Sequence, residues 1–174
     1  MADITIRFDD DQVRAMFQRL EATGRDTTPA RREIGEYMVD STKRRFSAGT
    51  APDGRRWASN SQATIEAFVG RYSSSYTKRG RLSKKGAERA MNKKPLIGES
   101  RTLSTQIFYQ LTGEGLEWGS NHPGAAMQQW GGSKGDFPHL WGDIPAREFL
   151  GISDEDREEI LAILDRHLED GVGG

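Results

Sequence analysis

Apolar and polar residues follow regular spacings in the N-terminal part of the chain, and these predict a strand followed by two helices. Apolar residues alternate with polar ones over residues 4–8, which is the period of a half-buried strand. They recur at helical spacing over residues 13–20, and the aspartates at 9–11 favour the start of that helix. A second helix is expected from Thr28, with Pro29 at its first position, to about residue 47. Its predicted inward face carries Ile34, Tyr37, Met38, Ser41 and Arg45, with Phe46 beside it.

A turn interrupts the helical pattern after Phe46. Residues 52–54 read Pro-Asp-Gly, in which proline presets one backbone dihedral and the next two residues tolerate a tight turn. Trp57 follows, and we expect it to anchor this loop to the core. A weaker apolar pattern over residues 59–69 predicts a short helix.

The C-terminal half shows the patterns of a β-hairpin and two further helical segments. Apolar runs at residues 107–111 and 116–118 flank a Thr-Gly-Glu-Gly turn, which predicts a hairpin. Residues 125–130 suit one or two helical turns. Ser153 is placed to cap a last helix whose acidic first turn favours the helix dipole. The predicted buried stripe of that helix is Ile160, Leu161, Leu164 and Leu168.

Together these elements predict the α+β class, with helices packed on a small, mostly antiparallel sheet. A chain of 174 residues fits one domain over residues 1–174. Only 34% of the residues are hydrophobic and 29% are charged, so the core must be lean. Residues 70–95 show no apolar period, and we expect a long, flexible basic loop there, inserted in the domain. A helix around residues 84–92 remains an open alternative within it.

Charge is distributed unevenly, although the formal net charge is only −1. Between Gly70 and Lys94 the only acidic residue is Glu88, and this window carries a net charge of +8. The last helix is the reverse, with eight aspartates and glutamates between positions 154 and 170. The cations that we expect to contact a partner or another subunit are Arg71, Lys78, Arg79, Arg81, Lys84, Lys85, Arg89, Lys93 and Lys94.

Three uses of this basic window remain open on the residues alone. It suits an acidic protein surface, including the acidic last helix of a neighbouring copy. It also suits nucleic-acid phosphates, with Tyr72 and Tyr76 available to stack on bases. The third reading is a solvated loop without a partner. The near-neutral whole chain argues against a dedicated DNA-binding domain, which is usually strongly basic.

No pattern typical of a catalytic, cofactor or metal site is present. The chain has no cysteine, which excludes thiolate nucleophiles and cysteine-based zinc sites. His122, His139 and His167 lie in no motif with a nucleophile, and the helix start accounts for the aspartates at 9–11. Residues 131–135 lack the spacing of a phosphate-binding loop. We therefore expect no enzyme, no cofactor and no metal. No apolar run approaches the roughly 20 residues of a membrane span.

Several short motifs follow one another in a characteristic order. A helix ending in Phe precedes the Pro-Asp-Gly loop and its Trp, and a Trp-Gly-Ser strand end, a Gln-Trp-Gly-Gly block and an Ile-Pro-Ala-Arg block come later. The motif residues are Pro52, Asp53, Gly54, Trp57, Gly119, Gln129, Trp130, Gly131, Gly132, Pro145, Ala146, Arg147, Phe149, Leu150 and Gly151. With this order and spacing the chain resembles the phage virion morphogenesis family, which includes tail completion proteins. It departs from that family at Glu148, where Pro is usual, at Trp130, where Phe is typical, and at Met127, where a small or β-branched residue is usual.

The resemblance implies a structural protein of bacteriophage assembly that acts in head–tail joining or tail completion. Such a neck component is expected to form a homo-oligomeric ring and to contact other neck, connector or tail proteins, with packaged DNA as a further contact and no membrane. We expect it in the virion, and in the host cytoplasm during assembly. The alternative function is a nucleic-acid-binding accessory protein that uses residues 70–95. Arg147 lies in a rigid extended segment and suits a bidentate partner. The residues leave open whether that partner lies in the same chain or in a neighbouring copy, and we favour support of the following helix within the chain.

Overall fold

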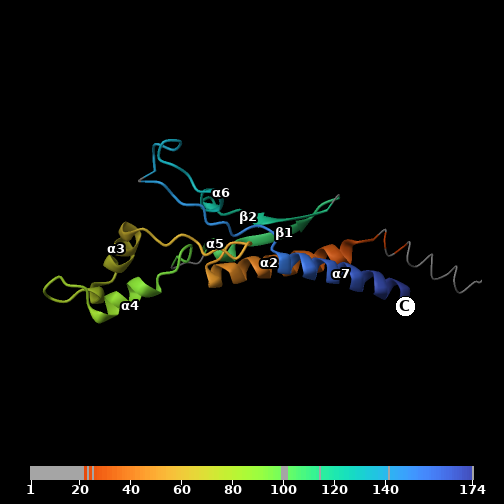
Figure 1. The fold of residues 1–174 in the computed structure, drawn as a ribbon, viewed down its shortest axis with the longest axis horizontal. Coiled ribbons are helices and arrows are strands. Elements are labelled where there is room, and N and C mark those ends of the chain that lie inside the picture. Colours follow the sequence, from red (N-terminus) through yellow and green to blue (C-terminus); the bar gives the residue numbers. More distant parts are fainter. Residues whose placement is uncertain are drawn as a thin grey trace, which may run out of the picture.

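The long helix α2 (Thr28–Ala48) is the central element of the protein (Figure 1). The computed structural model describes residues 26–98, 102–113, 115–140 and 142–173, together with Ala22 and Gly24. A hairpin of β1 (Ile107–Leu111) and β2 (Leu116–Ser120) packs along α2, and so does the last helix α7 (Asp154–Gly173). The predicted strand over residues 4–8 and the predicted helix over residues 13–20 lie outside the described residues.

Helix α2 presents the inward face that its apolar spacing predicts. Pro29 lies in the first turn, where its missing N–H leaves no hydrogen bond unmade. The helix ends at Ala48, after which the Gly49 N–H donates to the Arg45 carbonyl at 2.7 Å. Every residue of the predicted inward face is buried except Tyr37, which is half-buried. The buried side chains of α2 are Ala30, Ile34, Met38, Ser41, Thr42, Arg45 and Phe46.

The hairpin and α7 complete one half of the core. The two strands pair antiparallel from Ile107 opposite Ser120 to Leu111 opposite Leu116, which confirms the predicted hairpin and the α+β class. A cluster of buried residues forms where these elements meet α2, and half-buried Trp118 packs against it from β2. Its members are Ala30, Ile34, Met38 and Ile163.

Helix α7 begins as predicted, but a different stripe is buried. The Asp156 N–H donates to Ser153 Oγ at 3.1 Å, and the Ser153 N–H donates to Asp156 Oδ2 at 2.8 Å, a reciprocal capping pair. Ile163 is 1% exposed, whereas Leu161 is 56% exposed and Leu168 is 41% exposed, so the prediction was wrong for these two leucines. The reason is that Asp156, two turns before Ile163, must also face α2, which sets the rotation of the helix.

The basic segment contains more regular structure than the predicted loop. It includes the 3₁₀ turn η1 (Ser73–Ser75) and α4 (Lys84–Asn92), and α3 (Gln62–Gly70) directly before it packs against both, so both helices considered from the sequence are confirmed. Serine side chains start both α-helices: Ser61 Oγ accepts from the Thr64 N–H at 3.2 Å, and Ser83 Oγ from the Gly86 N–H at 3.1 Å. These elements form a small unit at one end of the elongated molecule (Figure 1).

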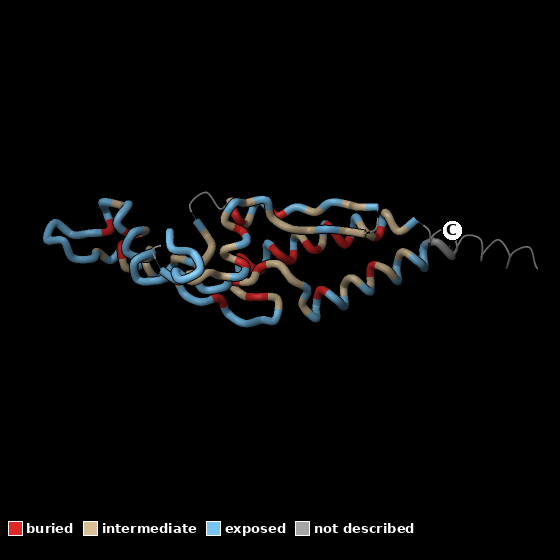
Figure 2. The backbone as a smooth tube through the Cα atoms, turned by 90° about the horizontal axis from the view of Figure 1, so that it is seen from above, coloured by how far each residue is buried: buried red, intermediate tan, exposed pale blue. Residues whose placement is uncertain are grey.

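A second core cluster closes the other end of α2. Short helices α5 (Thr102–Thr105) and α6 (Ala125–Trp130) lie there, and α6 confirms the helical turns predicted for residues 125–130. Figure 2 shows the buried positions gathered in the central body, with the small basic unit largely exposed. None of the helices that the structure describes has the length and apolar character needed to cross a membrane.

Candidate functional site

Three aromatic side chains hold the end of α2 against two loops. The Phe46 ring lies 5.4 Å from that of Trp57 and 5.1 Å from that of Phe149, measured between centroids. Phe149 is fully buried, and Trp57 Nε1 donates to the Glu148 carbonyl at 2.8 Å. The expectation that Trp57 anchors its loop to the core is confirmed, and the loop is thereby joined to residues 148–149 near the C-terminus.

Gln129 of α6 holds the same C-terminal segment through its side-chain amide. Its Oε1 accepts from the backbone N–H groups of Phe149 at 2.9 Å and Leu150 at 3.0 Å, and its Nε2 donates to the Leu150 carbonyl at 2.9 Å. The side chain is 8% exposed. One amide therefore satisfies three backbone groups that would otherwise be unpaired in a partly buried segment.

Arg147 makes a bidentate contact within its own chain, as favoured from the sequence, but it binds a loop and not the helix that follows it. Its Nε donates to the Ala58 carbonyl at 2.9 Å and its Nη2 to the Ser59 carbonyl at 3.0 Å. It therefore clamps the loop that follows Trp57 and does not support the following helix, so that part of the prediction was wrong. Burial lowers the pKa of Arg147 from its ordinary value.

A buried ion pair between Arg45 of α2 and Asp156 of α7 completes the cluster. Arg45 Nη2 donates to Asp156 Oδ2, and its Nη1 donates to the carbonyls of Phe149 at 3.0 Å and Gly151 at 2.7 Å. Asp156 is 1% exposed and also accepts from the Ser41 hydroxyl. Burial alone would raise the pKa of Asp156, but the hydrogen bonds from Ser41 and Ser153 and the charge of Arg45 lower it overall.

Sequence reasoning missed this ion pair, because it assigned the acidic first turn of α7 to the helix dipole alone. Arg45 lies on the predicted inward face of α2, and a buried guanidinium requires an anion or several acceptors. That requirement was the available signal, and Asp156, three residues after the capping Ser153, was the carboxylate positioned to answer it. We call the seven residues that converge here the motif cluster: Arg45, Phe46, Trp57, Gln129, Arg147, Phe149 and Asp156.

Two motif glycines lie where any side chain would clash. Gly131 has φ +73°, and a Cβ there would lie 2.6 Å from the Ile144 carbonyl oxygen. The neighbouring Gly132 pairs with Ile144 through two backbone hydrogen bonds of 2.9 and 2.8 Å. Gly151 has φ +150°, and a Cβ there would lie 2.7 Å from Pro52 Cγ. These contacts join α6 to the Ile-Pro-Ala-Arg block, and the Pro-Asp-Gly loop to the start of α7.

The other motif residues lie at the edge of this cluster or away from it. Asp53 Oδ1 accepts from the Arg55 N–H at 3.0 Å and shapes the turn that Gly54 completes. Gly119 lies in β2 opposite Phe108, outside the cluster. Trp130 is 74% exposed. Pro145 and Ala146 are also exposed, and Leu150 packs against the cluster from its edge.

At least three of the nine predicted contact cations are used inside the chain. Arg89 donates to the hydroxyls of Ser74 at 3.0 Å and Ser75 at 3.1 Å, and its guanidinium lies 4.4 Å from the Tyr72 ring centroid. Lys93 donates to the Ile97 carbonyl, and Lys94 to the Ser47 carbonyl at 2.8 Å. These three side chains hold the basic unit together and attach it to α2, while Arg71 is exposed near the end of α3.

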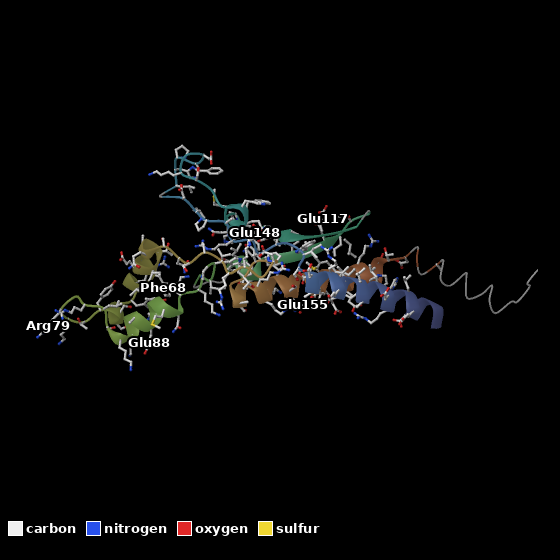
Figure 3. The ribbon with its side chains drawn as sticks, viewed as in Figure 1. Phe68, Arg79, Glu88, Glu117, Glu148 and Glu155 are labelled. Atoms are coloured by element: carbon white, nitrogen blue, oxygen red, sulfur yellow. The ribbon has the colours of Figure 1, made fainter. Side chains whose placement is uncertain are left out.

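The other five cations are exposed on one turn and at the start of α4, and we call this group the basic tip: Lys78, Arg79, Arg81, Lys84 and Lys85. The turn is closed by hydrogen bonds between Thr77 N–H and the Arg81 carbonyl at 2.8 Å and between Gly80 N–H and the Thr77 carbonyl at 2.9 Å. Within the described part of the chain, none of the five side chains makes an ion pair or hydrogen bond. Figure 3 shows Arg79 at the far end of the molecule.

The three histidines have structural contacts. His122 Nδ1 accepts from the Gly124 N–H at 3.0 Å, and His167 Nε2 lies 3.0 Å from the Asp26 carbonyl oxygen. The His139 ring packs edge-on against Phe137, with centroids 6.2 Å apart. Across the described residues, no group of three or more His, Asp or Glu side chains is arranged to hold a metal ion.

Comparison with known proteins places this arrangement in a family. No curated protein and no solved structure matches the chain. The model of the phage virion morphogenesis family matches residues 8–169, which is nearly the whole chain and includes every residue of the motif cluster. The protein is thus a member of the phage virion morphogenesis family.

Proposed function

We propose that this protein acts in the neck of a phage particle, in head–tail joining or tail completion, and that the basic tip is one of its contact surfaces. Family membership gives it a structural or assembly role in a bacteriophage virion. The observation that carries the finer proposal is the basic tip, because five exposed cations are held on one turn and the helix start that follows it, at the end of an elongated molecule.

The division of the nine cations supports this use. Arg89, Lys93 and Lys94 are bound to oxygen acceptors of the chain, so the fold accounts for them. The five cations of the basic tip repel one another, because none of them forms an ion pair within the described residues; the nearest carboxylate in the sequence, Glu88, lies one turn further along α4. Such an arrangement lowers the stability of the free protein slightly and is relieved by an acidic partner. Proteins that join large assemblies use complementary charge in this way to orient the approaching surfaces.

The test is to replace all five tip residues by serine and supply the variant to a phage or prophage that lacks this gene. We expect particle joining to fail, so that electron microscopy of the lysate shows filled heads apart from finished tails. The circular dichroism spectrum should stay that of the wild type, since the five side chains support no other contact in the described structure. The matched control exchanges Lys and Arg at the same five positions, which keeps the charge and should keep infectivity. A wild-type particle yield from the serine variant would overturn the proposal.

A nucleic-acid-binding accessory role is the second candidate, and Tyr76 is the observation that favours it. Tyr76 is 41% exposed beside the basic tip and is free to stack on a base. Tyr72 is not, because its ring is covered by Arg89. If the five tip cations all contact phosphates of duplex DNA, the logarithm of the affinity should fall with the logarithm of salt concentration with a slope of about −4 to −5. No binding at low salt would remove this candidate.

A further inference from the structure

The outward face of α7 carries two exposed leucines that no described part of the chain covers. Leu161 and Leu168 are one heptad apart, and so lie on the same side of the helix, roughly opposite buried Ile163. Their exposed fractions are 56% and 41%. Apolar side chains in such a position are typical of a surface that is covered in an assembly.

Acidic side chains surround these leucines. At about 3.6 residues per turn, Asp154, Glu158, Asp165 and Glu169 fall on the same outward face, and Arg157 is the one cation among them in the described helix. All four carboxylates are exposed, and none has an ion-pair partner within the described part of the chain. By contrast, Glu33 of α2 and Glu159 on the flank of α7 both pair with Arg166, at 2.8 and 3.3 Å.

The basic tip has the complementary composition. Tyr76 and Leu82 face each other across an isolated antiparallel bridge and are 41% and 49% exposed. The five cations of the tip lie around this apolar pair in the sequence, at positions 78, 79, 81, 84 and 85. Each surface therefore offers two exposed apolar side chains among unpaired charges, and the signs of the charges are opposite.

A single copy cannot bring these two surfaces together. The basic tip lies at one end of the elongated molecule, and α7 runs from the central body towards the other end (Figures 1 and 3). We propose that the basic tip of one copy docks on the outward face of α7 in a second copy, so that the copies join head to tail. This inference rests on the proposed function of the tip as an assembly contact, and it identifies the partner.

The geometry of such a contact predicts an assembly of many copies. A head-to-tail contact uses two different surfaces, so it repeats from copy to copy and forms a ring if the rotation closes or a filament if it does not. A ring suits a part that surrounds the DNA channel of a neck. The charges are exposed, so salt should weaken the contact, with the apolar pairs Tyr76–Leu82 and Leu161–Leu168 supplying the component that salt does not screen.

Charge reversal tests the contact in both directions. The tip variant carries Arg79→Glu, Lys84→Glu and Lys85→Glu, and the helix variant carries Glu158→Lys, Asp165→Lys and Glu169→Lys. Each is supplied to a phage that lacks the gene, and the infectious titre is measured. Like charges facing each other across an interface cost several kcal/mol, so each variant alone should lower self-association on the order of a hundredfold or more and lower the titre. The chain with both sets of changes should recover most of the titre, because opposite charges face each other again.

A control variant separates this contact from a simple effect of net charge. It combines the tip changes with Glu36→Lys, Glu66→Lys and Glu117→Lys, which restore the same total charge on exposed positions outside the outward face of α7, and it should not recover the titre. The inference is overturned if the helix variant is fully infectious, if the combined variant stays as low as the tip variant, or if the control recovers equally well. In these cases the proposed function still stands if the five-serine variant fails to join particles. A wild-type titre from the charge-reversed tip variant would overturn both the docking contact and the proposed function.

Discussion

The buried ion pair between Arg45 and Asp156 should dominate the stability of the motif cluster. Asp156 is 1% exposed and receives hydrogen bonds from Arg45, Ser41 and the Ser153 N–H. Asp156→Asn keeps the size of the side chain and most of its acceptor positions but removes its charge. The Arg45 guanidinium, itself buried, would then lack an anion, and removing one partner of a buried ion pair typically costs about 3–5 kcal/mol.

This cost is large compared with the stability of an ordinary domain, which is about 5–15 kcal/mol. For a chain of this size it should lower the melting temperature by roughly 10 °C. Urea unfolding followed by far-ultraviolet circular dichroism measures the free energy of unfolding directly. Fluorescence provides a second probe, because Trp57 packs on Phe46 in the same cluster. An unchanged dependence of the unfolding free energy on urea concentration would show that stability alone has changed.

Two comparisons make the reasoning refutable. Asp154→Asn removes an exposed carboxylate from the same helical turn, and a charge that serves only the helix dipole is worth about 0.3–1 kcal/mol. A double-mutant cycle with Arg45→Met should show a coupling energy of about 2–3 kcal/mol, because removing both charges leaves no unpaired ion. The assignment of Asp156 as a buried partner of Arg45 would be refuted if Asp154→Asn and Asp156→Asn lowered the free energy of unfolding by the same small amount. It would also be refuted if the losses caused by the changes at 45 and 156 were additive in the double mutant.

Three further outcomes follow from the motif cluster and from Gly131 beside it. Gln129→Leu should destabilise the fold by about 3 kcal/mol in urea unfolding, because backbone groups of Phe149 and Leu150 lose their partner; a cost below about 1 kcal/mol would mean that water replaces the amide. Gly131→Ala should lower the free energy of unfolding by more than about 2 kcal/mol, because residue 131 has a positive φ and the added Cβ would clash with the Ile144 carbonyl. The control is Gly142→Ala, which should change it by less than about 0.5 kcal/mol, because no atom lies near the Cβ position there. The pKa of Asp156 is lowered in the folded state, so the stability that its carboxylate contributes is present above the unfolded pKa of about 3.9 and is lost as the pH falls below that value. On acidification the free energy of unfolding of the wild type should therefore fall more steeply than that of Asp156→Asn. Parallel plots of unfolding free energy against pH for the two proteins would contradict this.

Local patterns were sufficient for most of the secondary structure that the structure describes. The periodicity around α2 predicted its extent and its buried side chains apart from Ala30 and Thr42, because an amphipathic helix of this length records its inward face in every turn. The hairpin was predictable from two apolar runs around a glycine-containing turn. Ser153 was recognisable as a cap because capping depends on residues within one turn of it.

Long-range contacts decided what these patterns left open. Apolar spacing alone placed Leu161 and Leu168 in the core, but the contact between Arg45 and Asp156 rotates α7 so that Ile163 is buried and the two leucines face outward. The order of the motif blocks indicated the family, yet that order could not show which backbone carbonyls Arg147 would bind. Likewise, the net charge of the basic window could not separate Arg89, Lys93 and Lys94, which bind the chain itself, from the five exposed cations of the basic tip.

The sequence by itself therefore determined the local elements, the family and the uneven charge. Only the tertiary structure decided which charged side chains are buried partners and which are exposed at the two ends of the molecule. The physical reason is that hydrogen-bond patterns and apolar periodicity act within a few residues, whereas the pairing of Arg45 with Asp156 joins positions 111 residues apart. Such a partner is chosen by the way α2, α7 and the loops pack together, and no local pattern records that choice.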